Sequence, residues 1–289
     1  MPTAHPELIA TCWTSAGDAS PLGRQRSPSS VEERVRAVAA TGWQGLGLVL
    51  ADLLPVRDTI GFDGLRELVA ANGLRHTEVE LVEDWWTSGV AKEESDRRRD
   101  LLLDAAVALG ALHVKAGPPV DTGPADPHDL VPGLRALARA AGERGVRVAL
   151  EPLPFSTVST LPLGARLVEE AGVPNLGLVV DAWHVFRAGT SLDELADALG
   201  PGSVFAVELN DADPQVVGTL FEDTVHRRRY PGEGCFDLDG LVRVLTAAGF
   251  EGPWGVEMLS TEHRTRPLEE GLRAAHASAT AVLRRALSA

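Results

Sequence analysis

Short apolar runs and longer helical patterns alternate along this chain eight times, and this alternation restricts the fold more than any other feature. The apolar runs are rich in β-branched residues, and the helical stretches between them commonly end at a glycine. The apolar runs predict strands at residues 8–13, 45–50, 74–82, 111–116, 145–151, 176–181, 203–209 and 253–258. Because no linker-like break divides the pattern, we predict a single α/β domain, a (β/α)8 TIM barrel, over residues 1–289.

Helices are predicted between these strands, at residues 31–42, 62–71, 92–109, 129–144, 161–171, 192–199, 238–248 and 268–287. Ser30 and Glu33 have the spacing of a capping box at the start of the first helix, and Gly42 supplies its stop. A doubly wound sheet is the alternative fold that can be built from alternating strands and helices. That fold places a glycine-rich phosphate-binding turn after its first strand, and this turn is missing here.

Composition favours a globular protein and disfavours anionic partners. Hydrophobic residues make up 44% of the chain, and the formal net charge is −14, so nucleic acid and an anionic membrane surface would be repelled. Cys12 and Cys235 match no metal or redox spacing, and we interpret them as free thiols in a reducing compartment. Residues 1–7 lack a leader signature and no apolar run approaches membrane-spanning length, so we expect a cytoplasmic protein.

Four acidic residues stand at the ends of the last four predicted strands: Glu151, Asp181, Glu208 and Glu257. In a (β/α)8 barrel these strand ends meet at the face that carries the active site. Four uncompensated carboxylates would repel one another, so a bound divalent cation is the simplest way to balance their charge. Oxygen ligands favour Mn²⁺, Mg²⁺ or Co²⁺, with Zn²⁺ as a further option. Any single one of these acids could instead cap a helix or pair with a basic side chain.

Three further side chains are candidates for contact with a substrate. Glu78 and Glu80 alternate along the third predicted strand, and we expect only one of them, with Glu80 favoured, to line the barrel. Lys115, near the end of the fourth strand, could contact an anionic group or extend to solvent. Trp13 could offer an apolar face to a sugar ring or pack at the rim.

Motifs at the ends of the later strands resemble those of the xylose isomerase-like TIM barrels, the sugar phosphate isomerase/epimerase family. This family includes ketose 3-epimerases, hydroxypyruvate isomerase and inosose dehydratase. The order and spacing of the similar segments cover nearly the whole chain. These segments are Leu150-Glu151-Pro152, Asp181-Ala182-Trp183-His184, Glu208-Leu209-Asn210-Asp211, Pro231-Gly232-Glu233-Gly234 and Gly252-Pro253-Trp254-Gly255-Val256-Glu257.

The resemblance implies a set of metal ligands at the strand ends. Glu151, Asp181 and Glu257 match ligand positions of the family. Better-known members have a histidine where this chain has Glu208, so we expect Glu208 either to bind the metal ion as an additional anion or to bind substrate. His226, in the loop that follows, is a further candidate for the missing histidine.

The resemblance also implies residues that bind substrate. His184, three residues after Asp181, matches the histidine that hydrogen-bonds a substrate hydroxyl or carbonyl oxygen; a buried histidine satisfied by the backbone is the alternative. Arg229 resembles the arginine that approaches a substrate oxygen, and Arg227 or Arg228 could hold this role instead.

The implied chemistry is removal of an α-proton from a metal-chelated hydroxy-ketone to give an enediolate, with Glu151 and Glu257 as the proton shuttle. Return of the proton makes the chain an isomerase or epimerase of a sugar or polyol ketone. Loss of a β-hydroxyl makes it a lyase of the inosose dehydratase or 3-dehydroshikimate dehydratase type.

Two other functions have less support from the sequence. One is a barrel that binds a carbohydrate-like ligand without turnover. The other is an endonuclease IV-like enzyme, which needs a His-rich trinuclear zinc site and a basic surface that this chain lacks. The absence of a glycine-rich turn on the late strands favours a substrate without phosphate. Homo-oligomers are common in the family.

Overall fold

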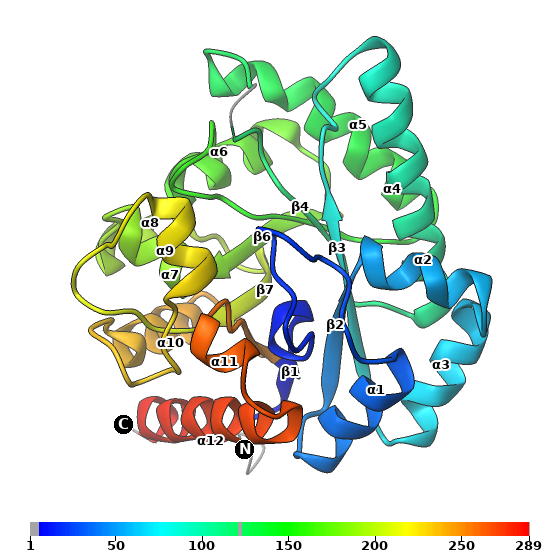
Figure 1. Cartoon of the computed structure of the whole chain (residues 1–289). Helices are drawn as coiled ribbons and strands as arrows, with labels where there is room; N and C mark the ends of the chain where they lie inside the picture. Colours follow the sequence, from blue (N-terminus) through cyan, green and yellow to red (C-terminus); the bar gives the residue numbers. More distant parts are fainter. Residues whose placement is uncertain (1–5, 121–122, 289) are drawn as a thin grey trace.

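Eight parallel strands close into a barrel in the order β1 to β8 in the computed structural model, and helices surround them (Figure 1). The structure describes residues 6–120 and 123–288, so most of the stretch searched for a leader lies outside the described residues. The strands are β1 Leu8–Ala10, β2 Gly45–Val49, β3 His76–Val82, β4 Val114–Ala116, β5 Val148–Leu150, β6 Leu176–Asp181, β7 Val204–Leu209 and β8 Trp254–Val256. The predicted (β/α)8 fold is confirmed.

The outer helices follow the predicted alternation. They are α1 Val31–Ala40, α3 Gly61–Ala71, α4 Gly89–Leu109, α5 Val131–Gly142, α6 Leu161–Ala171, α8 Leu192–Ala198, α10 Leu238–Ala247 and α12 Leu268–Leu287. The predicted capping box is present, because the Ser30 hydroxyl accepts from the Glu33 N–H and the Glu33 carboxylate accepts from the Ser30 N–H. The ring closes where α12 packs on α1 and where β8 pairs with β1.

Shorter helices occupy several connections and were not predicted as separate elements. They are η1 Cys12–Thr14, α2 Leu50–Asp58, η2 Pro127–Leu130, α7 Ala182–Arg187, α9 Leu220–His226 and α11 Thr261–Arg264. Most have too few turns for an amphipathic period to be visible. A local signal did exist for α9, since Thr219 and Glu222 form a capping box at its start. Within the described ranges, no helix combines the length and apolar character needed to cross a membrane.

Alternation along the strands separates an outer apolar core from a polar barrel interior. Leu176, Leu178 and Val180 of β6 belong to the main core that packs against the helices. The intervening inward positions include a small second cluster of Ala149, Val179 and Ala206. The next inward position on each of these three strands is an acid: Glu151, Asp181 and Glu208. The sheet geometry therefore points these acids to the same end of the barrel.

Candidate metal centre and active site

The four acids expected at the strand ends lie together inside the mouth of the barrel. Each of Glu151, Asp181, Glu208 and Glu257 offers one oxygen, and these oxygens all lie within 4.8 Å of one another. The register explains the convergence: Asp181 pairs with Glu208 across β6 and β7, and Glu208 pairs with Gly255, two residues before Glu257. All four side chains are buried. We refer to them below as the acid cluster.

The acid cluster has the chemistry of a divalent cation site. Glu208 Oε1 pairs with Lys115, whereas Glu208 Oε2 is buried and has no hydrogen-bond partner among the described residues. An unsatisfied buried acceptor costs about 1–3 kcal/mol, and more when it is charged. Hard cations such as Mn²⁺ and Mg²⁺ bind several carboxylate oxygens at once, so an ion inside the cluster would satisfy this oxygen.

Asp181 is fixed by three donors. Arg228 Nη1 lies 2.7 Å from Asp181 Oδ2, and Asn210 Nδ2 donates to the same oxygen at 2.8 Å. The backbone N–H of His184 donates to Asp181 Oδ1 at 2.9 Å, so Asp181 also caps α7, which is the alternative role considered for a single acid. Burial acts to raise the pKa of Asp181, but Arg228 and His184 hold it below its usual value.

Glu208 and Glu257 have the opposite shift. Burial raises the pKa of Glu257 to about 8; the charge of Arg228 opposes this, while Glu151 and Asp181 add to it. Burial and the charge of Glu257 raise the pKa of Glu208 well above its usual value, although Lys115 opposes the rise. Burial and mutual repulsion thus favour the protonated forms of Glu208 and Glu257, and a divalent cation in the cluster would favour their ionised forms instead.

His184 lies beside the acid cluster, as expected from its position after β6. Its Nε2 is 3.2 Å from Glu151 Oε1, and its ring stands nearly perpendicular to those of Phe155 and Trp183, with centroids 6.0 and 5.4 Å away. The other ring nitrogen, Nδ1, is buried with no hydrogen-bond partner in the described part of the chain. The alternative of a histidine satisfied by the backbone therefore does not describe this ring.

Lys115, Glu78 and Glu80 form a charged layer next to the acid cluster. Lys115 is fully buried, so the alternative in which it extends to solvent is wrong; its Nζ contacts Glu208 and lies 3.4 Å from both Glu78 and Glu80. The expectation that only one of the two glutamates faces inward is also wrong. Residues two apart on a strand share a face, and both side chains reach Lys115 inside the barrel. The sequence analysis had considered Glu78 beside Glu80 but favoured Glu80 alone.

The structure brings Arg228, not Arg229, to the acid cluster. Arg228 is 1% exposed and its Nη1 lies 2.8 Å from Glu257 Oε2 in addition to its contact with Asp181. Arg229 points away, with its side chain 40% exposed and paired with Asp213 and Glu262. The cause is the extended backbone here, where isolated bridges at Arg227 and Arg229 leave Arg228 on the opposite side.

Two other candidates, Trp13 and His226, form no hydrogen bond or ion pair with the acid cluster among the described residues. Trp13 is half-buried in η1, shortly after β1, which puts it at the expected rim. His226 lies outside the acid cluster: its Nδ1 is 3.1 Å from Arg264 Nη1 and 3.4 Å from the Thr261 hydroxyl. The structure therefore does not place His226 as the histidine expected in the metal site.

The Pro231–Gly234 segment is held by Asp211, a residue of the strand-end motif to which the sequence analysis gave no role of its own. The Asp211 carboxylate accepts from the backbone N–H groups of Gly232 and Phe236, each at 3.0 Å. Gly232 has a φ of +84°, and a Cβ on Gly234 would lie 2.2 Å from Asp211 Oδ1. Both glycines are thus required by the turn, which fixes the chain just after Arg228.

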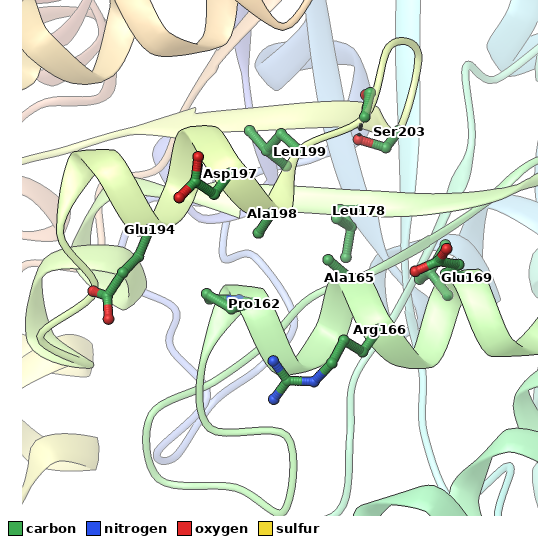
Figure 2. A pocket seen from close by; sticks show the side chains of 12 residues that line it. Pro162, Ala165, Arg166, Glu169, Leu178, Glu194, Asp197, Ala198, Leu199 and Ser203 are labelled. Atoms are coloured by element: carbon green, nitrogen blue, oxygen red, sulfur yellow. Dashed lines mark hydrogen bonds between the residues drawn. The ribbon is translucent and has the colours of Figure 1, made fainter.

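A groove of about 770 Å³ lies elsewhere, on the outside of the barrel wall between α6 and α8 (Figure 2). Its lining includes Arg166 and Glu169 of α6 and Asp197 of α8, with Leu178 and Ser203 at the wall. Leu178 belongs to the outward-facing core, so the barrel wall separates this groove from the acid cluster. The groove therefore plays no part in the candidate site.

Comparisons with known proteins identify relatives in sequence and in fold. The 3-dehydroshikimate dehydratase of Pseudomonas aeruginosa is 30% identical over 260 residues, which cover 84% of this chain and 39% of that protein. The chain thus spans about two fifths of the length of the curated dehydratases that it matches. The inosose isomerase of Halalkalibacterium halodurans is 31% identical over 144 residues, which cover 49% of this chain and 50% of that protein.

Solved structures match over almost the entire barrel. The IOLI protein, in a structure with a bound zinc atom, superposes with a TM-score of 0.84 at 21% identity, covering 98% of this chain and 100% of that one. An L-ribulose 3-epimerase matches with a TM-score of 0.76 at 15% identity, covering 98% and 96% of the two chains. A family model described as xylose isomerase-like TIM barrel matches residues 35–279. The chain therefore belongs to the xylose isomerase-like TIM barrel family.

Proposed function

We propose that this chain is a divalent-metal-dependent enzyme that moves a proton beside the carbonyl group of a small polyhydroxylated ketone, as an isomerase or epimerase. The observation that carries the proposal is the acid cluster, in which Glu151 and Glu257 flank the acids of β6 and β7. The relatives named inosose isomerase support the substrate class. The neighbour with a bound zinc atom supports a divalent ion.

Each residue of the site has a proposed part in this chemistry. The acid cluster would hold the ion, which when bound polarises the substrate carbonyl group. Glu151 and Glu257 directly follow β5 and β8, which β6 and β7 separate, so one would remove the α-proton and the other would return it from a different direction. His184, whose Nε2 lies beside Glu151, would donate to a substrate oxygen. Arg228 keeps Asp181 and Glu257 in position.

Dehydration is the second candidate, because the relatives that align over the longest part of this chain are 3-dehydroshikimate dehydratases. This reaction begins with the same removal of an α-proton and continues with departure of a β-hydroxyl group as water. Glu208 is the candidate acid for protonating the leaving hydroxyl. Its contact with Lys115 favours a role as a ligand instead.

The test is solvent deuterium incorporation into a panel of ketoses, inososes and 3-dehydroshikimate, with Mn²⁺, Mg²⁺, Co²⁺ or Zn²⁺ added to the EDTA-treated chain. We expect metal-dependent exchange beside a carbonyl group, reduced about 10²–10⁴-fold in Glu151→Gln and in Glu257→Gln. An isomer or epimer as product supports the first candidate, and a product that has lost water supports the second. Absence of exchange and of turnover with every ion and substrate would contradict both.

The state of the two cysteines is the basis on which we propose a cellular compartment for the chain. Both cysteines are free, Cys12 in the interior and Cys235 at the surface. Free thiols are usual in reducing compartments, which supports the proposal that the chain acts in the cytoplasm on a small carbohydrate-like molecule.

A further inference from the structure

Lys115 is a cation with an unusual position for its residue type. Its side chain is fully buried inside the barrel, where a lysine is rarely found without paired acids. Its ammonium group contacts Glu208 Oε1 more closely than it approaches any other acid, since Glu78 and Glu80 both lie 3.4 Å from Nζ. Glu208 is therefore its principal partner.

This contact divides the two oxygens of Glu208 between two functions. Oε1 is taken by the ammonium group of Lys115, and Oε2 is buried without a hydrogen-bond partner within the described residues. Glu208 also belongs to the acid cluster, whose oxygens lie within 4.8 Å of one another. Lys115 thus leaves one oxygen of Glu208 available to an ion and offsets the charge of the carboxylate.

We propose that Lys115 is a positioning residue, and that the Lys115–Glu208 pair acts on the bound divalent ion as one neutral oxygen ligand. The inference rests on the proposed function, because it concerns the ion that the acid cluster would hold. It assigns to Lys115 a role in setting ion affinity, in place of the contact with a substrate anion that its position in the sequence suggested. The remaining charged groups around Nζ are Glu78, Glu80 and, farther away, Glu257.

The proposal predicts effects of opposite sign for two single substitutions. Glu208→Gln keeps an oxygen of similar size but removes the principal partner of Lys115, so the ammonium charge beside the ion is less well balanced and we expect Mn²⁺ to bind at least roughly tenfold more weakly. Lys115→Met leaves the Glu208 charge uncompensated, so we expect Mn²⁺ to bind at least roughly tenfold more tightly. The double variant has a neutral oxygen ligand and no lysine, and we expect an affinity within about threefold of that of the original chain.

The measurement is calorimetric titration of Mn²⁺ into the EDTA-treated full chain, with thermal unfolding of each variant recorded beside it. Glu94→Gln is the control: this acid is exposed on α4 and lies outside the acid cluster, where salt screens its charge, so its loss should change Mn²⁺ affinity by less than about threefold. If Lys115→Met does not fold, the comparison of Glu208→Gln with the double variant still tests the proposal. Only a Lys115–Glu208 pair that acts as one ligand predicts that Mn²⁺ affinity recovers when the lysine is also removed.

The outcomes separate this inference from the proposed function. If the original chain binds Mn²⁺ but Lys115→Met leaves the affinity unchanged or weakens it, the pair does not act as a neutral ligand and the inference is overturned. Failure of the double variant to recover from Glu208→Gln has the same meaning. If the original chain binds no Mn²⁺, Zn²⁺, Mg²⁺ or Co²⁺, the metal centre itself is wrong and both proposals are overturned.

Discussion

Arg228 and Arg229 are adjacent in the sequence and have opposite environments. Arg228 contacts two members of the acid cluster and is held by the Thr224 hydroxyl, which accepts from its Nε and Nη2 at 3.1 and 2.9 Å. Arg229 forms ion pairs at the surface. Surface pairs of this kind contribute little to stability, whereas removal of one partner from a buried pair leaves an uncompensated charge.

The two arginines therefore give a matched pair of variants. Arg228→Met should lower the free energy of unfolding in EDTA by about 3–5 kcal/mol, because Asp181 and Glu257 lose a buried cation. Arg229→Met should change it by less than about 1 kcal/mol. Urea unfolding followed by circular dichroism measures both values. Equal effects of the two substitutions would contradict the assignment of Arg228 to the site.

The sequence predicted the acids of the site better than its cations. The acids could be identified because a carboxylate at the end of a buried strand is costly unless it is paired or binds a ligand, and the register brings these strand ends together. Arg228 was not distinguished from its neighbours because the choice depends on the backbone bridges of Arg227 and Arg229. Glu78 was set aside in favour of Glu80 through a wrong assignment of faces, which the two-residue period of a strand could have prevented.

At the scale of elements, short segments at the mouth of the barrel are joined by buried polar contacts. His263 of α11 connects the segments that follow β8 and β1: its Nε2 donates to the Thr14 carbonyl oxygen at 2.9 Å. Its Nδ1 then accepts from the Tyr230 hydroxyl at 3.1 Å. Burial lowers the pKa of His263 to about 4, although the contact with Thr14 opposes the shift. The neutral ring is thus the form that the fold requires.

This histidine predicts a pH dependence of stability. Between its usual pKa of 6.5 and the folded value of about 4, the unfolded chain binds a proton that the folded chain does not, so stability falls as the pH falls. From pH 7 to pH 5 the loss from this group should be about 2 kcal/mol. Urea unfolding at pH 7 and pH 5 gives the loss in the free energy of unfolding for the original chain and for His263→Gln. The difference between the two losses is the contribution of His263. The exposed His128, as His128→Gln, serves as control; equal pH dependence in all three chains would refute the assignment.

The main elements could be predicted because the outer helices are long enough to show their period, short apolar runs stand between them, and glycines or capping boxes mark many boundaries. The short helices and the loop held by Asp211 could not. Their positions depend on contacts between distant segments, such as that of Asp211 with the N–H of Gly232 and that of His263 with Thr14.

At the scale of the whole molecule, the barrel separates an apolar exterior wall from a charged interior. The buried acids Glu78, Glu80, Glu151, Asp181, Glu208 and Glu257 lie around two buried cations, Lys115 and Arg228. Such an excess of buried negative charge is costly unless protons or a cation compensate for it. The divalent ion that we propose would therefore serve both the chemistry and the stability of the fold.

The most direct test of this account is a crystal structure of the chain grown with Zn²⁺, with anomalous scattering measured at the zinc edge. We predict an anomalous peak inside the barrel, about 2.0–2.2 Å from one oxygen each of Glu151, Asp181, Glu208 and Glu257. No peak at the acid cluster, or zinc bound only at surface histidines, would contradict the central claim that these four carboxylates form a metal centre.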